Sequence, residues 1–168
     1  MTVSVLAPGL DQPDCLRLYR KLAAGVTVVT SQGAAGPVGM TASAVTSVSV
    51  EPPILLLCLR SGSHTLESIR GHQGFAVHLL RDDQHGRARA FADPRNAPAD
   101  RFAGVDFDCV LGVPVLADAL AWSVCALEEE RTYGDHAVVL GRVVAAGVNE
   151  GEPLLWHDST FARLERGL

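Results

Sequence analysis

The stretch from Gly36 to Pro53 constrains the fold of this chain most, because its residue types recur with a period of two. Small hydroxyl residues recur at odd positions, and apolar residues recur at even positions. Successive side chains of an extended strand point to opposite faces, so the pattern predicts β-structure with one neutral polar face and one apolar face. The polar set is Thr41, Ser43, Ser47 and Ser49, and the apolar set is Met40, Ala42, Ala44, Val48 and Val50.

The polar face also indicates what this stretch could bind. Its hydroxyl groups are small, neutral hydrogen-bond donors and acceptors, which suit a flat ligand with many polar atoms better than a metal ion or a nucleophilic reaction. The alternative is an ordinary half-buried strand whose Ser and Thr side chains meet water. The alternation by itself favours that alternative.

The other patterns predict a mainly β protein with a few helices. Helices are expected from about Asp11 to Gly25 and from about Asp82 to Ala92. The connections are short and lack the strand–helix–strand alternation of parallel sheets, so about eight strands favour an antiparallel barrel. The run Ile54–Leu59 is expected to be a strand buried on both faces. The main expected strands are 26–30, 38–50, 54–59, 75–80, 119–133 and 136–148, followed by a short hairpin at 153–164.

Length and charge narrow the class of protein. The 168 residues are expected to form one domain, with an N-terminal helix in residues 1–24 and the barrel in residues 25–168. A net charge of −5 without a cluster of Lys and Arg argues against nucleic-acid binding. The longest apolar run is too short to cross a membrane, and Met1–Leu10 does not resemble a signal peptide, so a cytoplasmic protein is expected. The four cysteines lie far apart, so no metal site is expected.

A second candidate binding feature is the loop between Arg60 and Thr65. It is rich in Ser, Thr and Gly and precedes a short predicted helix that ends at Gly71. Free backbone N–H groups at a helix N-terminus, together with hydroxyl groups and a nearby arginine, can bind an anion. The alternative is plain N-capping of the helix by Ser63, which needs no ligand.

Several familiar catalytic signatures are absent, but an ordered set of short motifs is present. The sequence contains no G-x-G-x-x-G, P-loop, G-x-S-x-G or H-E-x-x-H pattern. Between Leu22 and Leu164 the chain resembles the flavin reductase-like family, whose members are split β-barrels that bind FMN. The motifs are Gly39-Met40-Thr41-Ala42-Ser43, Thr46-Ser47-Val48-Ser49, Glu51-Pro52-Pro53, Ser63-x-Thr65, Phe91-Ala92, Arg101-Phe102-Ala103-Gly104 and Gly134-Asp135-His136.

The resemblance implies an antiparallel split β-barrel of the FMN-binding type and a role for each motif. The strand that contains Met40, Thr41, Ala42 and Ser43 would lie along the flavin, and Ser47 and Ser49 would extend the contact. Ser63 and Thr65 would hold the phosphate at the helix N-terminus. Phe91 would form an apolar wall beside the flavin, unless it is an ordinary core residue.

The Gly-Asp-His motif is the part of the resemblance closest to catalysis. It implies that His136 helps to seat the nicotinamide of NADH or NADPH and that Asp135 orients His136 or shapes the turn. Because the two cofactors carry the hydride transfer, His136 is a positioning residue rather than an acid or base. His64 occupies a position where relatives often have a basic residue. The phosphate site would then carry less positive charge than usual, so the choice between FMN and FAD stays open. His157, which follows Trp156, is a further candidate.

Three functions follow from these observations. The first is an NAD(P)H:flavin oxidoreductase that supplies reduced FMN or FAD to a partner monooxygenase. The second is a split-barrel oxidase with a fixed FMN, and the third is a non-enzymatic flavin- or haem-binding module. The Gly134-Asp135-His136 motif favours the first. The resemblance also implies a homodimer with the flavin near the subunit boundary.

Overall fold

The computed structural model describes residues 11–165 and residue 167. The prediction made for Met1–Leu10 therefore lies outside the described residues. Within the part that is described, no helix has the length and apolar character needed to cross a membrane.

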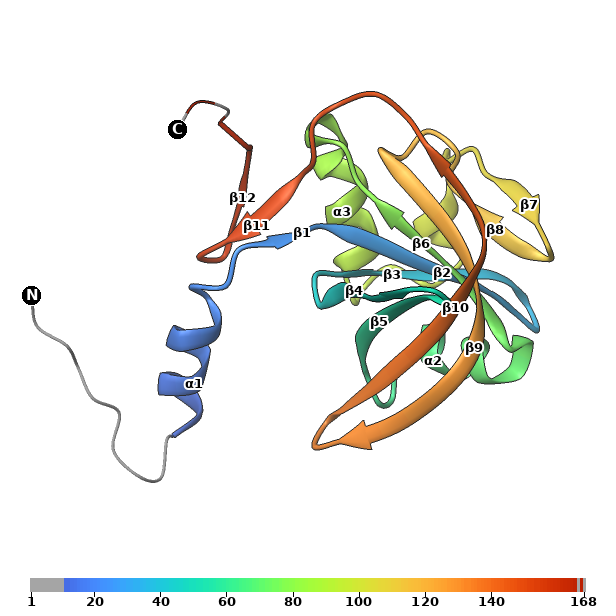
Figure 1. Cartoon of the computed structure of the whole chain (residues 1–168), viewed down its shortest axis with the longest axis horizontal. Coiled ribbons are helices and arrows are strands. Elements are labelled where there is room, and N and C mark those ends of the chain that lie inside the picture. Colours follow the sequence, from blue (N-terminus) through green and yellow to red (C-terminus); the bar gives the residue numbers. More distant parts are fainter. Residues whose placement is uncertain (1–10, 166, 168) are drawn as a thin grey trace, which may run out of the picture.

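Seven antiparallel strands form the main sheet, and this sheet curves into a barrel (Figure 1). The order is β3-β2-β6-β9-β10-β5-β4, so β3 and β4 are the two edges of the sheet although they follow each other in the chain. The antiparallel pairing and the curvature of this sheet agree with the antiparallel split barrel expected from the sequence. The strands are β2 (Thr27–Gly33), β3 (Gly36–Ala42), β4 (Val45–Val50), β5 (Pro53–Arg60), β6 (Gly74–Leu79), β9 (Ala121–Tyr133) and β10 (His136–Val148).

The alternating stretch is two strands rather than the single strand that its period predicts. β3 ends at Ala42 and β4 begins at Val45, on the opposite edge of the sheet. A register shift in the β4–β5 pairing breaks the period again, and Val50 is 91% exposed. β4 is an edge strand, so one of its edges has no strand partner within the described residues, and none of its residues is buried. β5 likewise buries only Leu57 and Leu59 fully, so the expected burial on both faces is wrong.

Side chains from the strands and from one helix fill the barrel interior. α2 (His64–His72) places Leu66 and Ile69 in the same buried cluster as Phe75 of β6 and Val139 of β10. The helix begins where the side chain of Ser63 accepts a hydrogen bond from the backbone N–H of Leu66. The predicted cap at Ser63 is therefore confirmed.

A second layer covers the outer face of β2 and β3. α3 (His85–Ala92) follows a 3-10 turn at Asp82–Gln84, and its Ala88 and Phe91 pack with Phe102 of the 3-10 turn Asp100–Phe102. The rings of Phe91 and Phe102 meet edge to face with centroids 5.0 Å apart. A separate two-stranded ribbon is formed by β7 (Asp108–Val110) and β8 (Val113–Val115).

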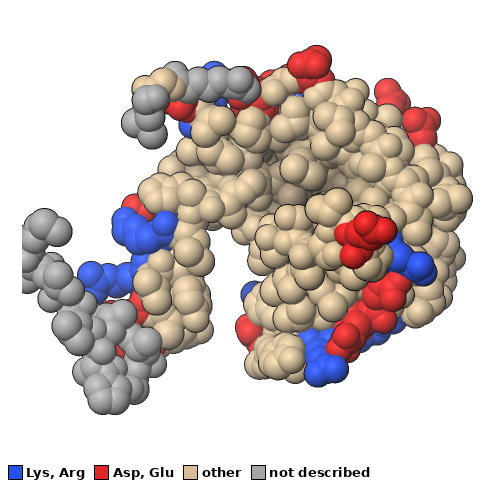
Figure 2. All heavy atoms as spheres, in the orientation of Figure 1, with Lys and Arg blue, Asp and Glu red and all other residues tan. Residues whose placement is uncertain are grey.

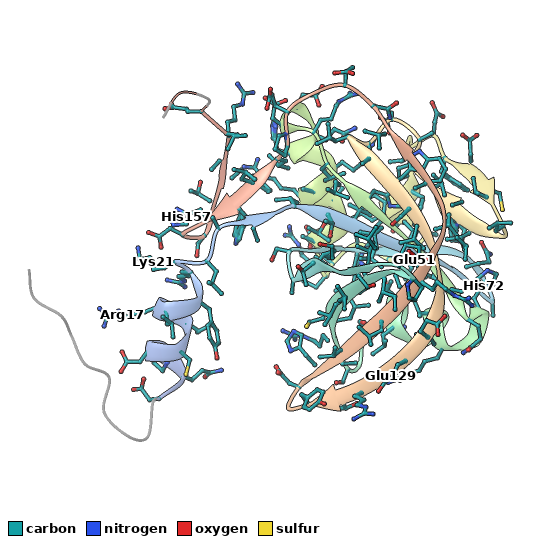
Figure 3. The ribbon with its side chains drawn as sticks, in the orientation of Figure 1. Arg17, Lys21, Glu51, His72, Glu129 and His157 are labelled. Carbon is teal, nitrogen blue, oxygen red and sulfur yellow. The ribbon has the colours of Figure 1, made fainter. Side chains whose placement is uncertain are left out.

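The N-terminal helix stands apart from the barrel. α1 (Gln12–Tyr19) has no buried residue, and a notch with mostly uncharged sides separates it from the barrel (Figures 1 and 2). The chain is held just after the C-terminal end of α1, where Lys21 Nζ donates to Asp158 Oδ2 at 2.7 Å. Figure 3 shows Lys21 beside His157. Asp158 lies in the turn of a small sheet formed by β1 (Ala24–Gly25), β11 (Leu155–His157) and β12 (Thr160–Ala162).

The fully buried His78 on β6 makes stability depend on pH. Its Nδ1 lies 2.9 Å from the carbonyl oxygen of Val28, whereas Nε2 has no partner, and burial lowers the pKa of this imidazole to about 4. Below pH 6.5 the unfolded chain therefore binds a proton that the folded chain does not, so stability falls with falling pH until about pH 4. We expect the free energy of unfolding to drop by about 2 kcal/mol between pH 7.5 and pH 5.

Urea unfolding at several pH values measures this effect. The carboxyl groups whose pKa values are lowered, such as Asp118 beside Arg87 and Glu130 beside Arg70, lose their stabilisation at lower pH than this window. In His78→Gln the decrease between pH 7.5 and pH 5 should largely vanish. An unchanged slope in that variant would assign the dependence to other groups.

Candidate functional site

One cavity of about 540 Å³ lies between the end of β3, one face of α3 and the β11–β12 hairpin. We call it the aromatic cavity. The helix contributes residues at positions i, i+3, i+4 and i+7, which share one face of a helix. The lining residues are Val26, Thr41, Ala42, Ser43, His85, Ala88, Arg89, Ala92, Trp156, Ser159, Thr160 and Phe161.

Aromatic rings form the wall of this cavity opposite β3. Trp156 and Phe161 face each other across the hairpin, with ring centroids 5.1 Å apart and an interplanar angle of 70°. The guanidinium carbon of Arg89 lies 5.5 Å from the centre of the Phe161 ring, so a cation stacks on the same wall. Such a wall offers a planar, polarisable surface to a flat ligand.

The polar groups of β3 are presented to the aromatic cavity at its other side. The hydroxyl of Thr41 donates to the carbonyl oxygen of Ala88 at 2.6 Å, so its proton is used and only its lone pairs remain for a ligand. Ser43 is exposed at the point where β3 has ended. Its hydroxyl is therefore accessible to a polar edge of a ligand, whereas the carbonyl oxygen of the next residue, Ala44, accepts from the N–H of Cys58 at 2.9 Å.

A second cavity of about 490 Å³ lies between β3, the loop before α2 and the segment after α3. We call it the arginine cavity. It contains the predicted anion-binding loop and two guanidinium groups. The lining residues are Val38, Gly39, Met40, Thr41, Arg60, Gly62, Ser63, His64, Thr65, Phe91, Ala92, Pro94, Pro98 and Arg101.

Arg101 links two backbone segments at the base of the arginine cavity. Its Nη1 donates to the carbonyl oxygen of Gly39 at 2.7 Å and its Nη2 to that of Asp93 at 3.2 Å, which joins β3 to the end of α3. Its Nε is buried without a partner. An arginine has five N–H donors, so one donor on each of Nη1 and Nη2 remains unused besides the buried Nε. Beneath it, Gly39 lets the ring of Phe91 approach β3, because a Cβ there would lie 2.9 Å from that ring.

The two cavities adjoin each other, and the charged residues that line them have the same sign. Thr41 and Ala92 line both, so the cavities meet between β3 and the end of α3. Among the described residues that line them, none is Asp or Glu, whereas Arg60, Arg89 and Arg101 are present. In a chain with a net charge of −5, the charged residues of this lining carry only positive charge, which favours an anionic ligand.

Most of the predicted site residues lie around this groove. Ala42 and Ser43 line the aromatic cavity, Thr41 lines both cavities, and Met40 lines the arginine cavity. The arginine cavity also brings together Ser63, Thr65 and Phe91. Phe91 has no exposed surface, so it is a core residue as well as a wall of the cavity.

The other predicted site residues lie outside the linings. Ser47 and Ser49 are on β4 and line neither cavity, so their contact with a ligand stays a prediction. His136 lies opposite Arg60 in the β10–β5 register, and its Nδ1 is 2.8 Å from Asp135 Oδ1. This hydrogen bond lowers the pKa of the Asp135 carboxyl. The Asp-His pair is thus beside the arginine cavity but not in its wall.

Several residues of the groove were not identified as site residues from the sequence, among them His85, Arg89, Trp156 and Phe161. His85 and Arg89 could have been found from their spacing with Ala88 and Ala92, but α3 alone does not show which face meets β3. Phe161 comes from a hairpin that only the three-dimensional structure places over β3. Trp156 lines the aromatic cavity, whereas the neighbouring candidate His157 is exposed and points elsewhere (Figure 3).

Comparison with known proteins gives consistent matches over nearly the whole chain. The profile of the flavin reductase like domain matches residues 19–165. A probable flavin reductase of Rhizobium meliloti is 41% identical over 136 residues, which are 79% of this chain and 43% of that protein. The reductase component of 4-nitrophenol 4-monooxygenase/4-nitrocatechol 2-monooxygenase from Rhodococcus opacus is 35% identical, over 96% of this chain and 85% of that protein.

A solved structure has the same fold over its full extent. The NADH:FAD oxidoreductase of Streptomyces globisporus superposes with a TM-score of 0.88 and 32% sequence identity, covering 100% of this chain and 95% of that one. The chain therefore spans most of the Rhodococcus and Streptomyces proteins, and less than half of the Rhizobium protein.

Proposed function

The chain belongs to the family of flavin reductase-like domains and is an NAD(P)H:flavin oxidoreductase, and we propose that one flavin lies across the aromatic and arginine cavities. The family match confirms the resemblance inferred from the motifs. The electron donor is NADH or NADPH, the acceptor is FMN or FAD, and the reduced flavin is supplied to a monooxygenase component.

The main support for this position of the flavin is that two cavities of different character meet at Thr41 and Ala92. A flavin has a flat ring system with polar edges at one end and a phosphate at the other. The aromatic cavity offers stacking surfaces and uncharged hydrogen-bonding groups, and the arginine cavity offers guanidinium groups and a helix N-terminus. The buried Nε of Arg101, which lacks a partner, fits a site that receives an anion.

In this proposal the ring lies between β3 and the hairpin wall. Thr41 accepts a hydrogen bond from the ring, because its own proton is bound to Ala88. The backbone beside Ala42 and the hydroxyl of Ser43 bind the polar edge of the ring, while Trp156 and Phe161 cover it and exclude water.

The phosphate then lies in the arginine cavity. The N-terminus of α2 directs backbone N–H groups to it, and Ser63 and Thr65 stand beside these groups. Arg60 and Arg101 supply positive charge from two sides, and Phe91 closes the floor. Met40 contributes an apolar contact where β3 passes between the cavity and the core.

His136 is assigned to the nicotinamide side, with Asp135 holding its ring through the Nδ1 bond. When bound, the flavin accepts a hydride from the nicotinamide cofactor, so the protein supplies position rather than a base. His136→Ala should therefore reduce NAD(P)H oxidation while flavin binding is retained. Unchanged turnover in this variant would remove His136 from the site.

The exposure of the groove favours a flavin that exchanges with solvent over a fixed prosthetic group. Ser43, Arg89 and Ala92 are exposed along its length. A ligand in such an open site can leave after reduction, as delivery to a monooxygenase component requires. A fixed-FMN oxidase would need a cover over these residues.

The test is to follow NADH and NADPH absorbance under air while FMN, FAD or riboflavin is added in turn. We expect rapid oxidation that depends on the added flavin. Riboflavin should be the weakest acceptor, because it lacks the phosphate that the arginine cavity binds. A protein that retains flavin through gel filtration but oxidises neither nucleotide would contradict the reductase function.

A homodimer is part of the same proposal. Leu16 and Leu18 of α1, Leu22 just after it and Val50 at the end of β4 are exposed. Apolar groups at these positions would be covered by a second chain. Light scattering should give twice the mass of one chain, and a single-chain mass would contradict the dimer.

A further inference from the structure

We propose that Arg89 stabilises the negative charge that the flavin ring gains on reduction, so that this side chain raises the affinity for reduced flavin relative to oxidised flavin. The inference rests on the proposed function and on the position of the ring in the aromatic cavity. It gives a role to a residue of the cavity wall that binding of the neutral ring does not require. It follows from the missing ion pair of Arg89, the place of its guanidinium group and the neutral surroundings of the ring.

Arg89 differs from most arginines of the chain because it has no acidic partner. Its one recorded contact within the described residues is the stacking on Phe161. Arg87, two residues before it on the same helix, binds the carboxylate of Asp118 through Nη1 at 2.6 Å and Nη2 at 2.9 Å. The positive charge of Arg89 is therefore left without a carboxylate to neutralise it. The described arginines that do pair with a carboxylate are Arg17, Arg70, Arg81, Arg87, Arg95, Arg131, Arg142 and Arg163.

Stacking holds the guanidinium group at the wall of the aromatic cavity. Its carbon lies 5.5 Å from the centre of the Phe161 ring, and that ring contacts Trp156 edge to face. A guanidinium group that stacks on an aromatic face keeps its charge. Arg89 lies about one helical turn before Ala92, where the two cavities meet, and it lines only the aromatic cavity. Its charge is therefore on the side of the ring rather than on that of the phosphate.

The rest of the aromatic cavity contributes no negative charge. Of the described residues that line it, Arg89 alone is permanently charged, and His85 is the only other titratable group. The remaining polar side chains are the neutral hydroxyl groups of Thr41, Ser43, Ser159 and Thr160. The side chain of Arg89 is exposed, so water screens its charge. A ring that lies against it displaces part of that water and strengthens the interaction.

The charge balance of hydride transfer explains why this group distinguishes the two states of the flavin. The hydride carries two electrons and one proton from the nicotinamide to N5 of the ring, so the nicotinamide becomes cationic and the ring changes from neutral to anionic. A guanidinium group beside the ring gains an attractive interaction only as this charge develops. Such an interaction favours the product and the transition state over the bound oxidised flavin.

The reduction potential of bound FMN tests the inference without relying on activity. It is measured without oxygen against a reference dye, with dithionite as the reductant and no nicotinamide. In Arg89→Gln the affinity for reduced FMN relative to oxidised FMN should fall about tenfold, as expected for one charge pair partly shielded from water. The potential should then decrease by about 30 mV, since the couple transfers two electrons. Isothermal titration calorimetry should give an affinity for oxidised FMN within about threefold of wild type.

Two further variants separate charge from shape and from position. Arg89→Lys keeps the charge but not the planar group, so it should retain most of the wild-type potential. Arg142→Gln is the matched control, because it removes the same charge from an exposed ion pair with Glu128 on β10, outside both linings. It should leave the potential unchanged.

The outcomes distinguish this inference from the proposed function. An equal potential in wild type and Arg89→Gln, with FMN-dependent NADH oxidation intact, would overturn the role of Arg89 and leave the proposed function standing. The same holds if Arg89→Lys loses as much potential as Arg89→Gln, because the effect would then not depend on charge. A wild-type protein that binds no FMN would overturn both.

Discussion

Replacing Ala92 with tryptophan is expected to weaken flavin binding about 100-fold, equivalent to about 3 kcal/mol, while the protein remains folded. Ala92 is the last residue of α3, it is exposed, and it lines both cavities. An indole at this position would occupy the junction through which a single flavin must pass. Quenching of flavin fluorescence on titration with the variant gives the affinity, and thermal unfolding checks the fold.

Gly86→Trp is the matched control on the same helix. A Cβ at Gly86 would have no heavy atom within 4 Å, and the residue lines neither cavity. This variant should bind flavin as the wild type does. If Ala92→Trp also binds flavin normally, the ligand does not cross the junction, and the cavities would have to hold separate ligands.

Gly141→Ala is expected to destabilise the barrel by about 3 kcal/mol. A Cβ at this position of β10 would overlap the ring of Phe75 and lie 2.9 Å from Cβ of Cys125. Both neighbours are fully buried, so neither can move without displacing the core. For a chain of this length the melting temperature should fall by about 10 °C, measured by circular dichroism.

The cause can be separated from the general cost of changing a glycine. Gly71→Ala lies in α2 with open space around its Cβ, so it should leave stability unchanged or raise it by up to about 1 kcal/mol. The pair Gly141→Ala and Phe75→Leu should cost less than the sum of the single changes, because the smaller side chain makes room for the new methyl group. Additive costs would contradict overlap with Phe75 as the cause.

The barrel was predictable because its strands carry local signals. The β9–β10 hairpin, with its turn at Gly134, matches the expected bounds to within two residues. The boundary between β3 and β4 was not predictable from period alone, since Ser43 and Ala44 continue the alternation in sequence. Only the closing of the barrel requires the chain to pass from one edge of the sheet to the other there.

The site was predictable where one segment supplies several groups. Thr41, Ala42 and Ser43 are consecutive, and Ser63 and Thr65 lie at the N-cap and in the first turn of α2, so short motifs contain these groups. The opposite walls come from Arg89, Trp156 and Phe161, which lie far from those motifs in the chain. Their place in the site depends on how α3 and the last hairpin pack over β3, and no local pattern encodes that packing.

A crystal structure of the protein with bound flavin is the most direct test of the central claim that one flavin crosses both cavities. The account predicts the ring between Thr41–Ser43 and Trp156, and the phosphate between Ser63 and Arg101. A flavin whose ring lies in the arginine cavity, or whose phosphate lies away from the N-terminus of α2, would contradict it.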